Sequence, residues 1–418
     1  MSMNYSSIIP ALLSTALFMF GNGYLITFIS IRMSELGHSE QVIGIVASAY
    51  YIGLVLGALQ IAKFIKLLGH IRVFIIFIGL FNCVCLAHAI SDNIYLWFIL
   101  RLLAGISLAG FYVTIESWLL ECCTNYNRGV TLALYMVAIS SAQAFGQLLL
   151  EKYNGSSALP FVVVAIFLSL SIIPVAIYNR KITRTHEIEL INIHALTKIA
   201  ASSIFTCFVS GLILSSIYSL LPIIFDQITS KSDQTAYLMF ITLFGGMIFQ
   251  YPIGILSDSF DRRKVMIAVS IVIFTLSMLL VGVGYENFSF NQLAVIYFII
   301  GGMSFTFYPV ALSLICDNLK SSHIVSVSQG LSMVEGIGSI IGPIMAPPFI
   351  AYFGIKGLAI YFALIVLTLL LFLIYRIFKK ERISHNHFVV GLHTTPVVAE
   401  LDPRGEEYKD EAEKNNIH

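Results

Sequence analysis

The stretch RLLAGISLAGFYVTIESWLLE, residues 101–121, lies within a mostly apolar segment that runs from about Ile94 to Cys122. As an α-helix, this segment is long enough to cross the ~30 Å hydrocarbon core of a bilayer. It nevertheless contains Arg101 and Glu116, and charged side chains are costly in a membrane interior unless they have a function or a partner. These two charges therefore guide the interpretation of the whole chain.

Both charges lie on one face of the predicted helix. Successive residues of an α-helix are rotated by about 100° around its axis. Within an arc of roughly 80° on the helix surface lie Arg101, Gly105, Ala109, Tyr112 and Glu116. The two charges are separated by about 22 Å along the helix axis, so they cannot pair with each other. A polar face of this kind contacts protein or water and not lipid.

The composition places the chain among integral membrane proteins. Of its residues, 58% are hydrophobic and 11% are charged, whereas soluble domains are typically about 25% charged. The mean hydropathy is +0.88. The sequence contains no P-loop, no G-x-S-x-G and no H-E-x-x-H motif, and nothing in it indicates nucleic-acid binding. We therefore expect no enzymatic activity, no metal site and no cofactor.

Apolar runs of roughly 18–28 residues, separated by polar turns, predict twelve transmembrane helices in an all-α fold. The runs lie near 8–31, 41–62, 71–91, 94–121, 129–150, 158–178, 197–222, 235–256, 265–284, 292–316, 324–351 and 356–378. Within them, Pro222, Pro309 and Pro343 predict kinks or breaks, because proline interrupts the hydrogen bonds of a helix.

The polar segments predict the domain organisation and the orientation. The domains expected are a six-helix bundle at 1–178, a cytoplasmic linker at 179–196, a second six-helix bundle at 197–378 and a weakly ordered polar tail at 379–418. If the N-terminus is cytoplasmic, sixteen Lys and Arg residues lie in inner loops or directly after the last span, against four in outer loops. Since basic residues concentrate on the cytoplasmic side, both termini are predicted to be cytoplasmic.

The two halves show weak internal similarity, which is typical of duplicated transporters. At shifts of 196, 192 and 197 residues, the aligned pairs include Gly105 with Gly301, Tyr112 with Tyr308, Gly53 with Gly245 and Met136 with Met333. The last shift pairs Glu335 with Ala138. Arg101 and Glu116 have aromatic and apolar counterparts, so these charges are specific to the first half.

The loop after the eighth run reads GILSDSFDRRK, residues 254–264. Its Gly254, Asp258, Arg262 and Arg263 match the G-x-x-x-D-x-x-x-R-R/K loop motif, and in this the chain resembles the major facilitator superfamily. The first-half loop is degenerate. In this motif a carboxylate lies close to basic residues at the start of the next helix. These charges can contact the end of a neighbouring helix in one conformation and lose that contact in another. We expect these four residues to form a gating loop.

The resemblance extends over nearly the whole chain. It implies two pseudo-symmetric bundles whose first, fourth, seventh and tenth spans line a central cavity, with Asn22, Tyr112 and Tyr308 as candidates for its lining. Arg101 and Gly105 match a fourth-span pattern of several proton-coupled members. The phrase YVTIESWL resembles a poorly characterised bacterial branch, the YcaD type. A monomer in a bacterial inner (plasma) membrane is therefore expected.

Three charged residues are the principal candidates for function. Glu116, close to the cytoplasmic interface, and Glu335, close to the midplane, are candidates for carrying a proton. The alternatives are a structural ion pair or hydration at the interface for Glu116, and a protonated, hydrogen-bonded side chain between helices for Glu335. Arg101 cannot release its proton at ordinary pH, so we expect it to hold or gate a substrate.

The prediction that follows is a secondary transporter. Because the chain has no ATP site, active transport would depend on an ion gradient, with protons as the expected ion. We predict that the chain moves a small solute through the lipid bilayer by alternating access of two bundles. The alternative is a non-transporting sensor or scaffold that binds a partner through its C-terminal tail. The substrate and the direction of transport stay open.

Overall fold

The computed structural model describes residues 5–122, 128–152, 158–177, 193–317 and 324–378. Within these ranges the chain forms helices and no strand, which confirms the predicted all-α fold. Eleven stretches of these ranges are long and apolar enough to cross a membrane. The last of them, Gly330–Phe378, has 49 residues and contains most of the predicted span 324–351 and all of the span 356–378. The structure is thus compatible with twelve spans.

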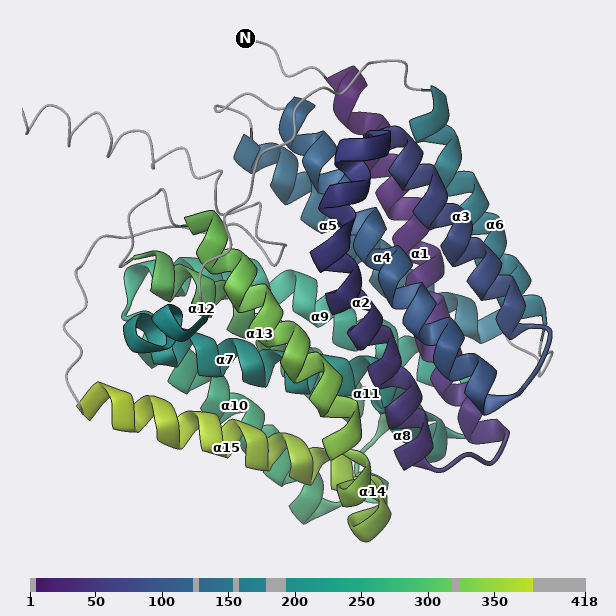
Figure 1. Ribbon diagram of the computed structural model, residues 1–418. Coiled ribbons are helices and arrows are strands. Elements are labelled where there is room, and N and C mark those ends of the chain that lie inside the picture. The colour runs from purple at the N-terminus through teal and green to yellow at the C-terminus, as the bar shows by residue number, and fades with distance from the viewer. Residues whose placement is uncertain (1–4, 123–127, 153–157, 178–192, 318–323, 379–418) are drawn as a thin grey trace, which may run out of the picture.

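Figure 1 shows the helices as two bundles, with the first at the upper right and the second at the lower left. The first bundle contains α1 (Tyr5–Glu35), α2 (Glu40–Leu68), α3 (His70–His88), α4 (Ile94–Cys122), α5 (Arg128–Gln147), the short 3-10 helix η1 (Leu148–Lys152) and α6 (Leu159–Ile177). The second contains α7 (Ile193–Ser219), α8 (Leu221–Thr229), α9 (Ser232–Ser259), α10 (Arg262–Val283), η2 (Tyr285–Asn287), α11 (Phe290–Ser304), α12 (Phe307–Cys316), α13 (Ile324–Met345), α14 (Pro347–Phe353), η4 (Gly354–Lys356) and α15 (Gly357–Phe378). Since α7 begins at Ile193, it includes the end of the predicted linker; the rest of that linker and the tail lie outside the described residues.

Three predicted spans are divided into two α-helices each, and proline accounts for these divisions. Pro222 lies in the first turn of α8 and Pro309 in the first turn of α12, where a missing N–H costs no helical hydrogen bond. Both predicted breaks are confirmed. In the eleventh span, Pro343 lies inside α13, and the division falls at Pro347, the first residue of α14.

Close helix contacts at glycines confirm the internal repeat. In the first bundle, α2 and α4 approach so closely that a Cβ at either contact glycine would collide with a carbonyl oxygen of the other helix. The contacts are Gly53 with Leu102 and Gly105 with Tyr50, and in the second bundle Gly245 with Phe298 and Gly301 with Thr242. The glycines and their partners are related by the predicted shifts of 192 and 196 residues.

A second set of glycine contacts corrects one part of the predicted alignment. These contacts are Gly23 with Gln143 and Gly146 with Phe20 between α1 and α5, and Gly211 with Glu335 and Gly338 with Phe208 between α7 and α13. They relate α5 to α13 by a shift of 192 residues, so the counterpart of Glu335 is Gln143. The predicted pairing with Ala138 is wrong, because backbone contact fixes the register and a matching dipeptide does not.

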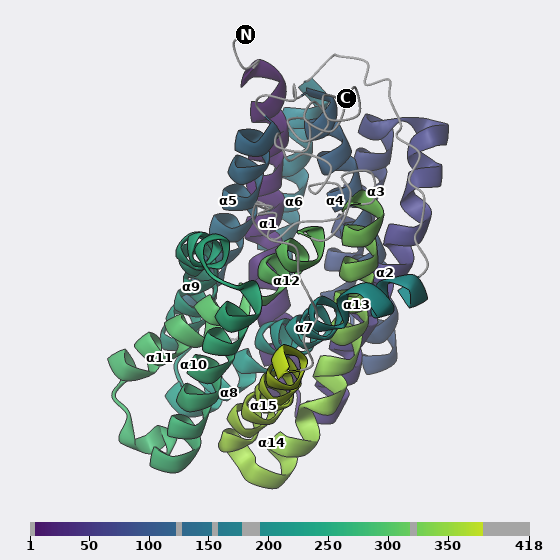
Figure 2. The same cartoon turned by 90° about the vertical axis from the view of Figure 1, so that its left-hand side faces the viewer.

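The two bundles meet at one end of the molecule. Between α2 and α13, Gly44 packs on the carbonyl oxygen of Pro343, and the Ser48 hydroxyl donates to the Ile340 carbonyl at 2.7 Å. Further along, Gly336 packs on Val55. The contacts of Gly44 and Ser48 use the first half of α2 and the second half of α13. The closed end therefore contains the α1–α2 loop, at the bottom of Figure 1, and the N-terminus lies at the opposite end (Figures 1 and 2).

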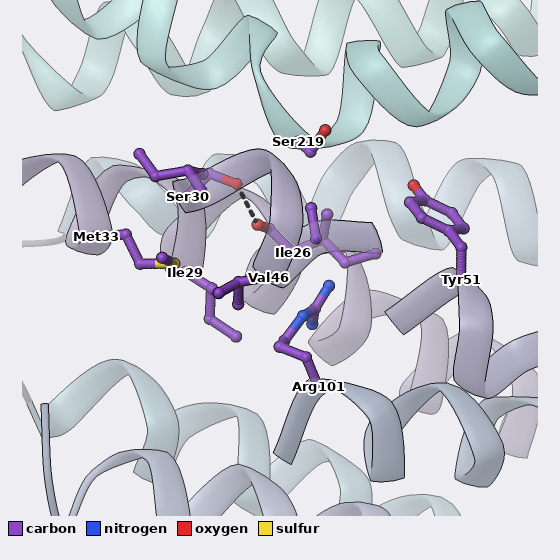
Figure 3. Close-up of a pocket in the computed structure, with 10 residues that line it drawn as sticks. Ile26, Ile29, Ser30, Met33, Val46, Tyr51, Arg101 and Ser219 are labelled. Carbon is purple, nitrogen blue, oxygen red and sulfur yellow. Dashed lines mark hydrogen bonds between the residues drawn. The ribbon is translucent and has the colours of Figure 1, made fainter. Parts of the chain in front are cut away.

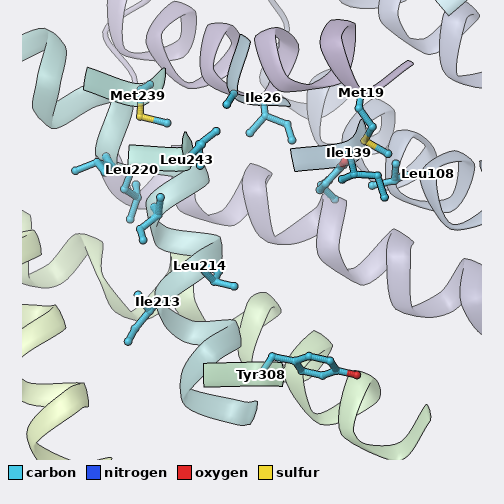
Figure 4. Packing of buried hydrophobic residues seen from close by; sticks show 14 of the residues in the cluster. Met19, Ile26, Leu108, Ile139, Ile213, Leu214, Leu220, Met239, Leu243 and Tyr308 are labelled. Carbon is cyan, nitrogen blue, oxygen red and sulfur yellow. The ribbon is translucent and has the colours of Figure 1, made fainter. Parts of the chain in front are cut away.

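Buried apolar side chains continue across this contact. One cluster includes members from both bundles, and Figure 4 shows side chains of α1, α4 and α5 together with side chains of α7 and α9. The helices α1 and α8 and the helices α5 and α9 also contact each other. The closed end is thus sealed by apolar packing as well as by the α2–α13 contact.

Candidate functional site

Arg101 lies on α4, where it is buried with 3% of its surface exposed. Its guanidinium carbon is 4.1 Å from the centre of the Tyr50 ring, a cation–π contact. The Tyr50 hydroxyl donates to Oδ1 of the buried Asn22 at 3.4 Å. Gly105, one turn after Arg101, allows the α2 backbone to approach at Tyr50. Two predicted site residues are therefore brought together by a tyrosine that the sequence analysis missed.

A small pocket adjoins Arg101 (Figure 3). Its walls come from α1, α2 and α4 of the first bundle and from the end of α7 in the second. The lining residues are Ile26, Ile29, Ser30, Met33, Ile43, Val46, Ala47, Tyr51, Arg101 and Ser219. Because Ser219 belongs to the opposite bundle, an occupant of this pocket would contact both bundles.

Arg101, which lines this pocket, and Asn22, which contacts Tyr50 next to Arg101, both carry unpartnered hydrogen-bond donors. Within the described residues, Nε and Nη1 of Arg101 are buried and have no hydrogen-bond acceptor. Nδ2 of Asn22, beside Tyr50, is also buried without an acceptor. Leaving buried donors unpaired costs about 1–3 kcal/mol each. The pocket, which has room for about one water molecule, is therefore suited to a small acceptor such as a water oxygen.

Two glutamines of α5 have different roles. The Oε1 atom of Gln143 accepts a hydrogen bond from the Tyr218 hydroxyl of α7 at 3.2 Å, which joins the bundles. Gln147 stays within the first bundle, where its Oε1 accepts from Thr27 at 2.5 Å and its Nε2 donates to the Gly23 carbonyl at 2.8 Å. Such contacts are typical of amides that hold transmembrane helices together.

Glu116 is buried on α4 in the half of the helix away from the closed end. Only 2% of its surface is exposed. Its Oε1 accepts a hydrogen bond from the Tyr135 hydroxyl of α5 at 3.4 Å, and its buried Oε2 has no partner among the described residues. An ionised carboxylate in such a place would be costly. The geometry therefore favours the protonated form of Glu116 in this conformation.

Glu335 is half-buried on α13, at the contact with α7. Its Oε1 accepts a hydrogen bond from the Ser210 hydroxyl at 3.0 Å. On the same face of α13, Gly338 and Gly342 pack on carbonyl oxygens of Phe208 and Leu212 in α7. The small residues of α13 thus bring α7 close, which places a hydroxyl donor against the carboxyl group of Glu335.

The two tyrosines that the repeat relates have different surroundings. Tyr308 of α12 is buried, and its hydroxyl lies 2.6 Å from the Ser332 hydroxyl of α13. Tyr112 of α4 is half-buried, and its hydroxyl donates to the sulfur of Met19 at 3.8 Å. The structure places Tyr112 beside α1 and holds Tyr308 within the second bundle.

The predicted gating loop forms a charged network within the second bundle. The guanidinium of Arg262 bonds both carboxylate oxygens of Asp317, at 2.6 and 3.2 Å, where α12 ends. It also contacts Oδ1 of Asp258 at 3.0 Å. Arg263 is buried at the start of α10, and a Cβ at Gly254 would meet no atom of another residue within 4 Å. The motif thus connects the α9–α10 loop to the end of α12, a partner residue that the motif alone did not identify.

Two bundles related by an internal repeat, sealed together at one end and containing buried charges, define a multi-pass membrane transporter. The sequence profile of the Major Facilitator Superfamily matches residues 11–223 and 203–398, and the chain belongs to that superfamily. Its members are transporters, which confirms the expectation that the chain is not an enzyme.

The chain is similar to curated bacterial proteins. It is 29% identical over 307 residues to an uncharacterized MFS-type transporter YcaD of Escherichia fergusonii, a match that covers 72% of this chain and 78% of the relative. It is 30% identical over 311 residues to the YcaD of Salmonella enteritidis, with 73% and 78% covered. The predicted resemblance to the YcaD type is confirmed.

Solved structures share the fold. A mutant form of the nucleoside transporter NupG has a TM-score of 0.74 at 15% identity, and the match covers 88% of this chain and 99% of the NupG chain. A D-xylose-proton symporter has a TM-score of 0.66 at 13% identity, with 89% and 97% covered. At such identities the likeness establishes the arrangement of helices and leaves the substrate open.

Proposed function

We propose that the chain is a proton-coupled secondary transporter that moves a small solute across a bacterial inner membrane by alternating access. The observation that carries this proposal is the buried carboxyl group of Glu116, whose Oε2 has no partner among the described residues. A protonated carboxyl group in this place holds a proton inside the first bundle, and it can release that proton when a change of conformation brings it into contact with water.

The orientation predicted from the basic residues supports this cycle. With both termini in the cytoplasm, the closed end of the molecule faces outward. The two bundles then meet on the outer side, and the halves of α4 and α5 that hold Glu116 and Tyr135 lie toward the cytoplasm. This arrangement corresponds to an inward-facing state, in which rocking of one bundle against the other would open the opposite side.

Glu335 gives the second bundle a carboxyl group of its own. It is half-buried between α13 and α7, two helices that also contact the first bundle. A proton bound there would therefore respond to the same movement that separates α2 from α13. We assign proton coupling to Glu116 and Glu335, and solute binding to the region of Arg101, Asn22 and Tyr112.

Proton flux in liposomes that contain the purified chain tests this proposal. A panel of small solutes is added outside, and a pH-sensitive dye reports the pH inside. A solute that drives proton movement with the wild-type chain should fail to do so with Glu116→Gln, while exchange of that solute across the membrane continues. Glu40→Gln, at the start of α2, serves as the matched control and should behave as the wild type.

The proposal fails if Glu116→Gln and Glu335→Gln each retain solute-driven proton flux with the pH dependence of the wild type. The alternative prediction, a sensor or scaffold that binds a partner through its tail, depends on residues 379–418, which lie outside the described residues. Deletion of residues 383–418 distinguishes the two, because persistent flux without the tail removes the basis of the scaffold hypothesis.

A further inference from the structure

Arg101 places a buried positive charge beside a small pocket between the bundles. We propose that this pocket binds a single halide ion, chloride under ordinary conditions, which neutralises Arg101 and stabilises the closed outer end. Asn22 and Tyr112 do not line the pocket, so both are left for contact with the solute. The inference goes beyond the proposed function, because the ion is distinct from the transported solute.

The first argument is the charge of Arg101. Its side chain is 3% exposed, and among the described residues no carboxylate forms an ion pair with it. The guanidinium contacts the ring of Tyr50, which has no net charge. Of the ten described residues that line the pocket, only Arg101 is charged. A buried charge without a counter-ion is costly, so the pocket favours an occupant with one negative charge.

The second argument is the hydrogen bonding of the pocket. Nε and Nη1 of Arg101 are buried and have no acceptor among the described residues. Figure 3 shows the guanidinium extending from α4 toward the side of the pocket that Ile26 and Ser219 form. The hydroxyls of Ser30 and Ser219 already donate to carbonyl oxygens of their own helices. A halide ion is spherical and accepts from whichever N–H groups face it, so its binding depends on Arg101.

The third argument is the size of the pocket, which has room for about one water molecule. A water molecule would accept a hydrogen bond from Arg101 but would leave its charge without a counter-ion. Chloride is only slightly larger than water and supplies that charge, and the flexible side chain of Met33 in the wall can accommodate the difference. Carboxylates, sulfate and phosphate are too large for this space.

The rest of the lining strengthens the attraction between the ion and Arg101. Six of the ten lining residues are apolar and come from α1 and α2, namely Ile26, Ile29, Met33, Ile43, Val46 and Ala47. Attraction between opposite charges increases as the surroundings become less polar. These side chains therefore favour an ion pair inside the pocket.

The position of the pocket links the ion to the conformation of the chain. Three walls belong to α1, α2 and α4 of the first bundle, and Ser219 of α7 contributes from the second. When the bundles separate at the outer end, Ser219 leaves the pocket and water reaches Arg101, so the ion is held less tightly. A ligand that binds one conformer better increases the population of that conformer. Chloride should therefore favour the closed outer end.

Thermal unfolding of the detergent-purified full-length chain measures binding, because a ligand that binds only the folded protein raises the unfolding midpoint. The sodium salts of chloride, bromide, nitrate and gluconate are compared at equal ionic strength. We expect chloride and bromide to raise the midpoint in a saturable manner relative to gluconate, and the larger nitrate to have a smaller effect. Equal midpoints in chloride and gluconate would overturn the proposal and leave the pocket with a water molecule only.

Replacement of the charge locates the site. Arg101→Gln should weaken chloride binding by about 10- to 100-fold, as expected for loss of hydrogen bonds to a charged group. Lys231→Gln removes an exposed cation at the same end of the molecule and is the matched control. A chloride affinity that is the same in Arg101→Gln and the wild type would contradict the assignment.

A second variant fills the pocket and keeps Arg101, so it tests the site even where loss of Arg101 prevents folding. Ala47→Val places two further carbon atoms in the lining, where the ion would lie, and should abolish the chloride-dependent rise of the midpoint. Ala58→Val makes the same change at an exposed position of α2 and is the control. A full chloride effect in Ala47→Val would show that the ion is bound elsewhere and that the proposal is wrong.

The link to closure is measured with spin labels at Ile90 and Glu286, which are exposed near the outer loops. At a chloride concentration of ten times Kd, the ratio of closed to open conformers should rise by about 10-fold, provided that the open form does not bind the ion. Arg101→Gln should remove this effect. Identical distance distributions in chloride and gluconate would contradict the stabilisation of the closed end.

The outcome for the ion is separable from the outcome for the proposed function. If a solute drives proton flux in liposomes and chloride raises neither the unfolding midpoint nor the closed fraction, the halide site fails and the transporter proposal stands. If chloride binds through Arg101 and no solute moves protons with the wild-type chain, the halide site stands and the transporter proposal is contradicted.

Discussion

The Tyr218 hydroxyl donates a hydrogen bond to Oε1 of Gln143 over 3.2 Å, and this bond joins the two bundles. In the internal repeat, Gln143 is the counterpart of Glu335, which accepts instead from Ser210 within its own bundle. Gln143 and Glu335, which occupy equivalent positions of the repeat, therefore have different structural roles. One holds the bundles together and the other keeps a carboxyl group between α7 and α13.

Loss of the Tyr218 hydroxyl should weaken the closed outer end. A neutral hydrogen bond contributes about 0.5–1.5 kcal/mol, so Tyr218→Phe should shift the ratio of closed to open conformers by about 2- to 12-fold toward open. The distance between spin labels at Ile90 and Glu286, both exposed near the outer loops, reports this ratio in a chain whose native cysteines are replaced. An unchanged distance distribution would show that the bond has no part in closure.

A methyl group at Gly44 should prevent the same closure. A Cβ there would collide with the carbonyl oxygen of Pro343, so the first half of α2 could no longer pack on α13. Gly44→Ala should open the outer end and reduce solute transport while the chain keeps its thermal stability, because the contact joins bundles that are each folded. Gly79→Ala on α3, where nothing lies within 4 Å, is the control. Wild-type transport and label distances in Gly44→Ala would contradict the role assigned to this contact.

The outer contact between α8 and α1 should depend on pH. Asp226 of α8 lies beyond the predicted seventh span, and burial, with a smaller effect of Glu35, raises its pKa above the ordinary value of 3.8. A raised pKa means that the contact favours the protonated acid, so ionisation as the pH rises through that pKa weakens the closed end. Asp226→Asn should keep the outer end closed as the pH rises.

The spin-label distance between Ile90 and Glu286, followed from acid to neutral pH, checks this prediction. The wild type should open with rising pH, and Asp226→Asn should not. Asp233→Asn, an exposed aspartate at the start of α9, should titrate as the wild type does. An equal pH dependence in Asp226→Asn and the wild type would assign the titration to another group.

The charged network of the α9–α10 loop should contribute to the stability of the second bundle. Asp317→Asn removes the charge that faces Nε and Nη2 of the buried Arg262, and we expect a loss of about 1–3 kcal/mol. Thermal unfolding of Asp317→Asn, Arg262→Gln and the double variant gives the coupling between the two residues. Additive losses would show that the pair makes no specific contribution.

Much of the fold was predictable because it depends on local properties of the sequence. Apolar runs of membrane length predicted the helices, and Pro222 and Pro309 predicted where two of them divide. Glycines at matching positions predicted the repeat, since only a residue without a side chain allows two helices to approach at Gly53 and Gly105. The shift between α5 and α13 was not predictable from a matching dipeptide, because contacts between helices fix the register.

The sequence alone identified Arg101 and Glu116 as charges that need a reason, because a charge in an apolar span is costly wherever the chain folds. Only the tertiary structure decided what surrounds them. Tyr50 reaches Arg101 from another helix, Tyr135 reaches Glu116 from α5, and Ser219 closes the pocket from the other bundle. Nothing in the sequence around Tyr50, Tyr135 or Ser219 indicates these contacts. Their importance arises from the packing of helices that are distant in the chain.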